Sequence, residues 1–224
     1  IHFIEGCDCH MTSLDDDGVP QVTVEQETFI NTVQYVFEKV AMSPSLLEQG
    51  NDDDLIVIKD DRALFYHEVL GAIYNFRDME GDFSLLPIPK MNGEQQGNTS
   101  IADGIWCTVL TVPITVVDTN TVGTVLAVLG GMSTDTVDKA LYEIVLGPKL
   151  FREKRTVSML KYALDAKAYD WSKEMSWANP IYSILMQQFD DKTFTLASSI
   201  QRNIKMLKAQ LRRFAAGLEY GNVE

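Results

Sequence analysis

The three tryptophans, with the acids near them, are the residues of this chain best suited to bind a small polar molecule. Trp106, Trp171 and Trp177 all lie in the second part of the 224-residue sequence. An indole ring buries a large apolar surface, and a carboxylate makes strong hydrogen bonds with hydroxyl groups. A sugar offers partners for both, because its C–H faces are apolar and its edge carries hydroxyls. These residue types therefore suit a carbohydrate ligand.

Trp106 lies in an apolar run, 105–112, that follows a long polar connection and comes shortly after Asp103. A chain that leaves one lobe and enters another at this point would place Trp106 near the crossing, so Trp106 and Asp103 are candidate ligand-binding residues. Trp177 is another candidate, because it lies among polar residues in loop-like sequence. The alternative for both tryptophans is burial in a core, which is how we interpret Trp171.

The Cys-x-Cys-His sequence formed by Cys7, Cys9 and His10 has two interpretations. It could be one corner of a metal site, or it could contain ordinary thiols. A structural zinc site needs four ligands, and no second cluster of ligands is present. We therefore expect no metal and no other cofactor. With Cys107 the chain has three cysteines, an odd number that cannot pair completely.

Enzyme signatures are absent from the sequence. It contains no Gly-x-Ser-x-Gly elbow, no phosphate-binding Gly-x-x-x-x-Gly-Lys loop and no His-Glu-x-x-His. A glycosidase needs two carboxylates across a cleft, and no feature singles out such a pair. The expectation is therefore a binding protein and not an enzyme. The net charge of −13 argues against nucleic-acid binding, because the phosphate backbone would be repelled.

A few strands among many helices are predicted from hydrophobic periodicity. Three consecutive acids followed by a glycine, at 15–18, predict a turn between two strands; a calcium loop would need spaced ligands. This pattern favours an α/β lobe with helices packed on a mixed sheet. Further strands are expected at 55–58, 62–66, 83–88 and 105–112. Helices are expected at 25–42, 69–76, 118–132, 135–145, 152–168, 179–189 and 194–218.

Apolar residues at a spacing of three to four mark the core-facing sides of three expected helices. In the first of these helices the residues are Phe29, Val33, Val36, Phe37 and Val40. In the helix at 152–168 they are Val157, Leu160, Leu164 and Ala168. In the last helix they are Met206, Leu207, Leu211, Phe214 and Leu218.

An ordered set of motifs resembles a known family. R-A-L-F-Y at 62–66 is followed by R-D-M-E-G-D-F-S-L-L-P-I-P-K at 77–90, and then by Trp-Cys at 106–107. In this order and with these spacers, the motifs are similar to the second half of the bacterial extracellular solute-binding proteins, family 1, of the carbohydrate-binding group. These proteins deliver ligands to ABC importers. The resemblance runs from about Gly18 to the C-terminus.

The resemblance implies a fold, a location and partners. The fold would be a periplasmic-binding-protein-like lobe of type II. The partners would be a sugar or oligosaccharide and the membrane subunits of an ABC permease, and the full-length lipoprotein would be anchored outside the cell. Further ligand-binding residues follow from the family's layout. They are Tyr66, His67 and Glu68, at a helix start that faces the cleft, and Asp170, in a segment that returns to it. The alternative for His67 is a capping or surface residue.

Family members are much longer than this chain, so the resemblance implies that the N-terminal half is missing. On this basis 1–100 would belong to the C-lobe, 101–147 to the N-lobe or hinge, and 148–224 to a helical return into the C-lobe. Two other functions stay open: a carbohydrate-active enzyme or accessory glycan-binding domain, and an interaction domain without a small ligand.

Overall fold

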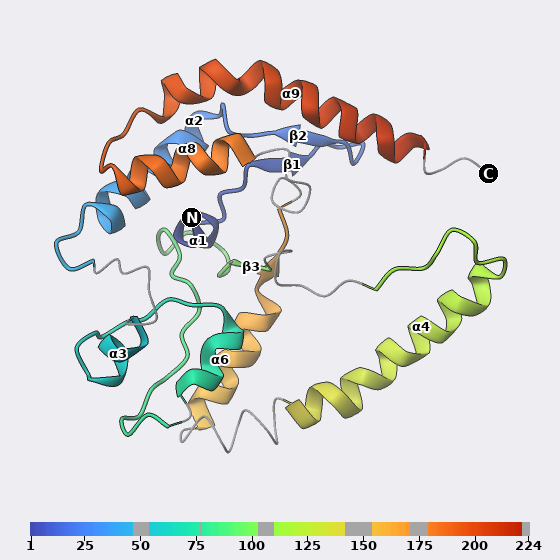
Figure 1. Cartoon of the computed structure of the whole chain (residues 1–224), viewed down its shortest axis with the longest axis horizontal. Helices are drawn as coiled ribbons and strands as arrows, with labels where there is room; N and C mark the ends of the chain where they lie inside the picture. The colour runs from blue at the N-terminus through green and yellow to red at the C-terminus, as the bar shows by residue number, and fades with distance from the viewer. Residues whose placement is uncertain (47–53, 77, 103–109, 142–153, 171–178, 221–224) are drawn as a thin grey trace. The chain divides into compact units, whose positions relative to one another are not determined.

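The structure is a computed structural model that describes residues 1–46, 54–76, 78–102, 110–141, 154–170 and 179–220. Among these residues the fold is mixed α/β, with many helices and small sheets (Figure 1), which confirms the predicted class. The described strands form two separate pairs and not the single mixed sheet that we expected. In one pair β1 (Thr12–Leu14) and β2 (Pro20–Val22) are antiparallel. In the other β3 (Ser100–Ile101) and β4 (Lys167–Ala168) are parallel.

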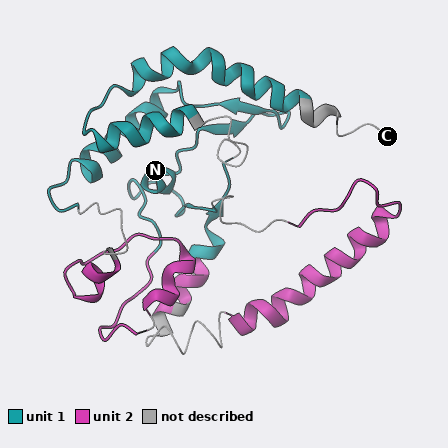
Figure 2. Cartoon of the chain, in the orientation of Figure 1, with its two compact units in different colours: residues 1–46, 87–108, 163–224 teal, residues 47–86, 109–162 magenta. Residues whose placement is uncertain are grey.

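The chain divides into two compact units (Figure 2). Four changes of unit follow from this division, after residues 46, 86, 108 and 162. The predicted assignment of segments to two lobes is a different division of the chain, and it stays a prediction. Unit 1 contains residues 1–46, 87–108 and 163–224, and unit 2 contains residues 47–86 and 109–162.

The acidic run near the N-terminus forms the predicted turn between β1 and β2. The Asp15 carboxylate accepts hydrogen bonds from the backbone N–H groups of Val19 (2.8 Å) and Asp17 (3.1 Å). The bond from Val19 is the largest of the influences that hold the pKa of Asp15 below its ordinary value. Gly18 adopts a φ of 78°, a conformation that costs glycine least. The three aspartates thus make a hairpin turn.

Helices of unit 1 enclose an apolar core. The predicted face of the first long helix is confirmed, because Phe29, Val33, Val36 and Phe37 are buried. The helices are α1 (His2–Gly6), α2 (Glu27–Val36) with its π-helical continuation Phe37–Ala41, α8 (Asn179–Asp190) and α9 (Leu196–Tyr220). The core cluster consists of Ile4, Met11, Val24, Phe29, Val33, Val36, Ile181, Leu185, Leu196, Ile200, Ile204, Leu207 and Leu211.

One predicted core residue of α9 is wrong. Met206 is 41% exposed, whereas Leu207 and Leu211 are buried. Consecutive helical residues point about 100° apart, while residues four apart share one face. Leu207 and Leu211 therefore define the core side, and Met206 lies outside it. Phe214 is partly buried against the same core.

Unit 2 contains the remaining described helices. Asp118 caps α4 as predicted, because its carboxylate accepts from the Thr121 backbone N–H (2.9 Å) and hydroxyl (2.6 Å). We expected a separate helix from 135. Within the described residues this segment instead continues α4 without a break. The elements are α3 (Asp54–Lys59), the 3₁₀-helix η2 (Leu70–Phe76), α4 (Thr119–Ser133), the π-helix η3 (Thr134–Asp138) and most of α6 (Lys154–Asp165).

Three predicted strands are wrong. Residues 55–58 lie in α3, while 62–66 and 83–88 have no regular structure. A run of four apolar residues cannot distinguish a short helix from a strand by its period. In 83–88 the adjacent prolines lack the N–H groups that a ladder needs. The predicted strand 105–112 lies mostly outside the described residues, and its end at 110–112 is exposed and irregular.

α6 ends earlier than the predicted helix 152–168. Leu160 is buried as expected and Leu164 is partly buried, whereas Ala168 belongs to β4. The backbone N–H groups of Ser100 and Ala102 donate to the carbonyls of Ala166 and Ala168. After the end of α6, the chain therefore pairs with β3 instead of continuing as a helix.

The polar loop after the second proline is ordered by the Gln95 side chain. Its amide group donates to the carbonyls of Gly6 (2.9 Å) and Gly97 (2.8 Å) and accepts from the Met91 backbone N–H (3.0 Å). Ile88, before this loop, lies against Gly6 at the end of α1. Residues 88–97 are therefore held against the N-terminal helix.

Replacing Gly6 with alanine should destabilise unit 1. The new Cβ would lie 2.2 Å from Ile88 Cγ2 and 3.1 Å from the Pro89 carbonyl oxygen. A β-branched neighbour with a stiff χ1 cannot move away easily, so we expect a loss of about 1–3 kcal/mol in the free energy of unfolding, measured by urea denaturation. Gly93→Ala is the control, because a Cβ there meets no atom within 4 Å. Equal stabilities of the two variants would contradict the close packing.

Candidate functional site

Asp170 is buried, with 3% of its surface exposed. One carboxylate oxygen accepts from the Met11 backbone N–H and the other from the Thr12 hydroxyl, each at 2.7 Å. β4 ends two residues before Asp170, so the pairing of β3 with β4 positions Asp170 beside the start of β1. Ligand binding by Asp170 stays a prediction, and both of its oxygens accept hydrogen bonds within unit 1.

Tyr66, His67 and Glu68 lie together in unit 2, immediately before η2. One Glu68 oxygen accepts from the Val69 backbone N–H at 2.8 Å, and the other lies 3.5 Å from the Tyr66 hydroxyl. The Tyr66 ring meets Phe76 edge-on, with ring centres 5.6 Å apart. The segment is thus anchored by Tyr66, while His67 and Glu68 are exposed.

An additional aromatic residue joins this segment. Phe65 is 73% exposed and lies three positions before the Glu68 carboxylate. Sequence reasoning missed Phe65 because it placed 62–66 in a strand. We call Phe65, Tyr66, His67 and Glu68 the 65–68 segment. It offers an exposed apolar ring and a charged acceptor, the pair of groups that a sugar recruits.

The other predicted ligand-binding residues, Asp103, Trp106 and Trp177, lie outside the described residues. Their roles stay predictions, as does the packing role of Trp171.

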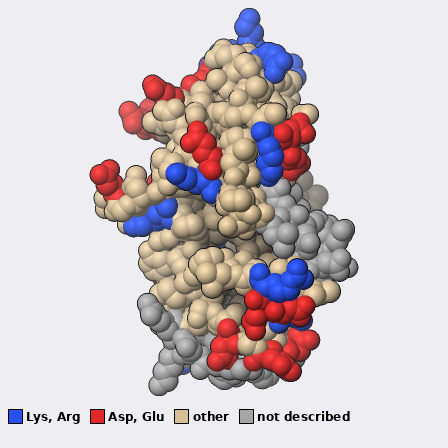
Figure 3. All heavy atoms as spheres, turned by 90° about the vertical axis from the view of Figure 1, so that its left-hand side faces the viewer, with Lys and Arg blue, Asp and Glu red and all other residues tan. Residues whose placement is uncertain are grey.

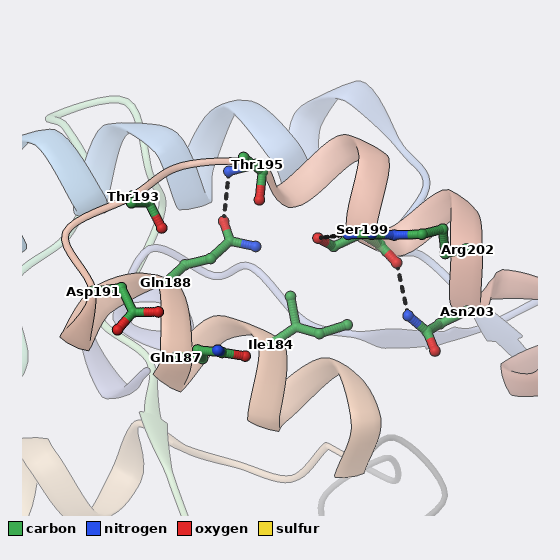
Figure 4. A pocket seen from close by; sticks show the side chains of 9 residues that line it. All are labelled: Ile184, Gln187, Gln188, Asp191, Thr193, Thr195, Ser199, Arg202 and Asn203. Carbon is green, nitrogen blue, oxygen red and sulfur yellow. Dashed lines mark hydrogen bonds between the residues drawn. The ribbon is translucent and has the colours of Figure 1, made fainter.

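A polar pocket between α8 and α9 was not predicted. Its volume is about 480 Å³ (Figure 4). Its residues come from two helices and the turn that joins them. The pocket was missed because the periodicity of each helix alone does not show that these residues face one cavity. The lining residues are Ile184, Gln187, Gln188, Asp191, Thr193, Thr195, Ser199, Arg202 and Asn203.

Cys7 and Cys9 are free thiols. Burial raises the pKa of Cys7, and burial is also the main reason that the pKa of Cys9 rises to about 12. The neighbouring His10 donates from Nε2 to a carboxylate oxygen of Asp8 at 3.1 Å. Within the described part of the chain, no three His, Cys, Asp or Glu residues are grouped to hold a metal ion.

Charged side chains of both signs lie in small groups on the face shown in Figure 3. Most of the described surface between these groups is uncharged. Of the helices in the described ranges, none has the length and apolar character needed to cross a membrane.

Comparison with known proteins found no family model, no curated protein and no solved structure that matches this chain.

Removing the Asp170 carboxylate should destabilise the protein strongly. Asp170→Ala leaves the Met11 N–H and the Thr12 hydroxyl without their acceptors, and bonds to a buried charge contribute about 1.5–3 kcal/mol each. We expect a loss of about 3 kcal/mol or more in urea denaturation. Asp170→Asn should lose less, because its amide can still accept from Met11 and donate to the Thr12 oxygen. Asp165→Ala, at an exposed position, is the control; a similar small effect of all three changes would refute the structural role.

The Cys9 thiol should react slowly with iodoacetamide in the folded protein. Its pKa of about 12, against an ordinary 9.0, leaves little thiolate at pH 8. Peptide mass spectrometry after timed labelling should show Cys9 modified more slowly than Cys7, and both modified quickly in urea. Because the folded state holds this proton more tightly, the contribution of Cys9 to stability is complete below pH 9 and falls as the pH rises toward 12. Labelling of Cys9 in the folded protein at the rate of an unfolded peptide would contradict the raised pKa.

Proposed function

We propose that this chain corresponds to the second half of an extracellular solute-binding protein, which captures a sugar or oligosaccharide for an ABC importer. The observation that carries the proposal is the 65–68 segment. The R-A-L-F-Y motif that carries part of the resemblance ends within it, and the structure exposes an aromatic ring and a carboxylate at that point.

The described geometry suits binding without chemistry. The bond from the Val69 backbone N–H holds one oxygen of Glu68, and the second accepts only a long bond, 3.5 Å, from the Tyr66 hydroxyl. An ionised carboxylate oxygen can accept more than one hydrogen bond, so the exposed Glu68 can also accept from ligand hydroxyls. Phe65 supplies a face for the C–H groups of a sugar ring. The Tyr66 ring contacts Phe76, and Phe76 in turn contacts Phe83, which limits the motion of the segment. A rigid backbone lowers the entropy lost on binding.

The architecture supports the finer fold proposal, a type II periplasmic-binding-protein-like fold. The chain forms two compact units and passes between them four times, after residues 46, 86, 108 and 162. Periplasmic binding proteins close around a ligand by bending at a few hinge residues between their domains, and residues at such crossings could serve as hinges. On this proposal the liganded protein docks on the membrane subunits of the permease, and the full-length protein is lipid-anchored outside the cell.

A panel of mono- and oligosaccharides should identify the ligand by thermal shift and calorimetry. The ligand should raise the melting temperature through its binding to the folded state, with no product formed. Phe65→Ala and Glu68→Gln should each weaken binding by about tenfold or more, since a charged hydrogen bond or a stacked ring contributes about 1–3 kcal/mol.

Two exposed positions provide matched controls for these variants. Glu94→Gln removes a carboxylate and Leu86→Ala removes an apolar side chain, both outside the 65–68 segment. If no saccharide in the panel shifts the melting temperature, the function is not carbohydrate capture. Unchanged affinity in Phe65→Ala and Glu68→Gln would remove the segment from the site, and release of reducing sugar would indicate an enzyme.

A further inference from the structure

The pocket of unit 1 is formed where the chain reverses between α8 and α9. Lys192 adopts a left-handed φ of 53°, which turns the chain sharply. The backbone N–H groups of Asp191 and Thr193 donate to the carbonyls of Gln187 and Gln188, at 2.8 and 3.0 Å. These bonds hold the start of α9 against the end of α8. The cavity of about 480 Å³ lies between them.

A buried amide offers an unused donor to this pocket. Gln188 is 6% exposed, and its side-chain oxygen accepts from the Thr195 backbone N–H at 2.9 Å. A backbone N–H can only donate, so this bond fixes which end of the amide is oxygen. Nε2 then faces the pocket (Figure 4), and it donates to no residue in the described ranges. Solvent in the pocket reaches this nitrogen, so a ligand acceptor placed there would replace water as its partner.

Two opposite charges line the same pocket. Arg202 donates from one nitrogen to the Ser199 hydroxyl at 3.0 Å, which directs its guanidinium along the wall and leaves its other N–H groups available. Asp191 lies in the turn immediately after α8, on the opposite side of the pocket in Figure 4. Neither residue forms an ion pair with another residue in the described parts of the chain. Each charge is therefore available to a ligand.

We propose that this pocket binds a small zwitterion, namely an amino acid with a short polar side chain. Its carboxylate accepts from Gln188 Nε2 and Arg202, and its ammonium group donates to Asp191. A ligand of net negative charge would face Asp191 and a chain of charge −13, and a cation would face Arg202. A neutral polyol can hydrogen-bond with both residues but gains no attraction between charges at either end. The proposal does not depend on carbohydrate binding at the 65–68 segment.

Isothermal titration calorimetry with L-serine tests the proposal. L-serinamide lacks the carboxylate and N-acetyl-L-serine lacks the ammonium group, so each should bind at least tenfold more weakly than L-serine. Arg202→Gln and Asp191→Asn should each weaken L-serine binding at least tenfold. Arg212→Gln and Asp190→Asn are matched controls on the same helices, exposed and outside the pocket, and should leave affinity unchanged. Backbone amide shifts of 195–203 on titration should locate the ligand.

Several results would overturn the zwitterion site. They are the absence of L-serine binding at concentrations up to about 10 mM, equal affinity for N-acetyl-L-serine, or unchanged affinity in Arg202→Gln. Displacement of L-serine by a monosaccharide would assign the pocket to polyols instead. A saccharide response that is lost in Phe65→Ala, with L-serine binding intact, separates the two proposals. Conversely, failure of every saccharide with intact L-serine binding rejects only the proposed carbohydrate function.

Discussion

The buried Asp170 carboxylate is the interaction on which the arrangement of unit 1 depends. It joins the segment after α6 to β1, across 159 positions of the sequence, through hydrogen bonds from Met11 and Thr12. A carboxylate with 3% of its surface exposed is stable only when its oxygens are satisfied, because it has lost its hydration. The same segment pairs with 100–102 through β3 and β4, so one short stretch holds both the N-terminal hairpin and the loop that Gln95 organises.

The two candidate binding regions occur where the chain leaves regular structure. The 65–68 segment precedes a 3₁₀-helix, and the pocket of unit 1 includes the turn between α8 and α9. In each region a hydrogen bond to a backbone N–H holds a polar side chain in place: Glu68 accepts from Val69, and Gln188 accepts from Thr195. The amide nitrogen of Gln188 donates to no described residue, and the second oxygen of Glu68 accepts only a long bond from Tyr66, so both can serve a ligand. Backbone groups at helix ends need such partners, which is why polar side chains collect there.

Sequence patterns predicted the helices better than the strands. The apolar stripe of α2 and the Asp118 cap are confirmed, and the predicted limits of α8 and α9 lie within two residues of the observed ones, since each feature depends on residues within one or two turns. The strands at 55–58, 62–66 and 83–88 are wrong because short apolar runs have no diagnostic period, and prolines remove ladder donors. Of the predicted ligand-binding residues, Tyr66, His67 and Glu68 lie together, Asp170 is buried, and Asp103, Trp106 and Trp177 lie outside the described residues.

By itself, the sequence determined the α/β class, the hairpin turn at 15–18 and the core face of α2, because turn chemistry and helical periodicity act between neighbours. Only the tertiary structure decided which polar groups stay available. The partners of Asp170 are 158 and 159 positions away, and Phe65 is exposed in a segment without regular structure. The pocket at Gln188 exists because α8 and α9 fold back on each other. Contacts of this kind depend on how the helices pack. Packing involves residues far apart in the sequence, so a local sequence pattern does not predict it.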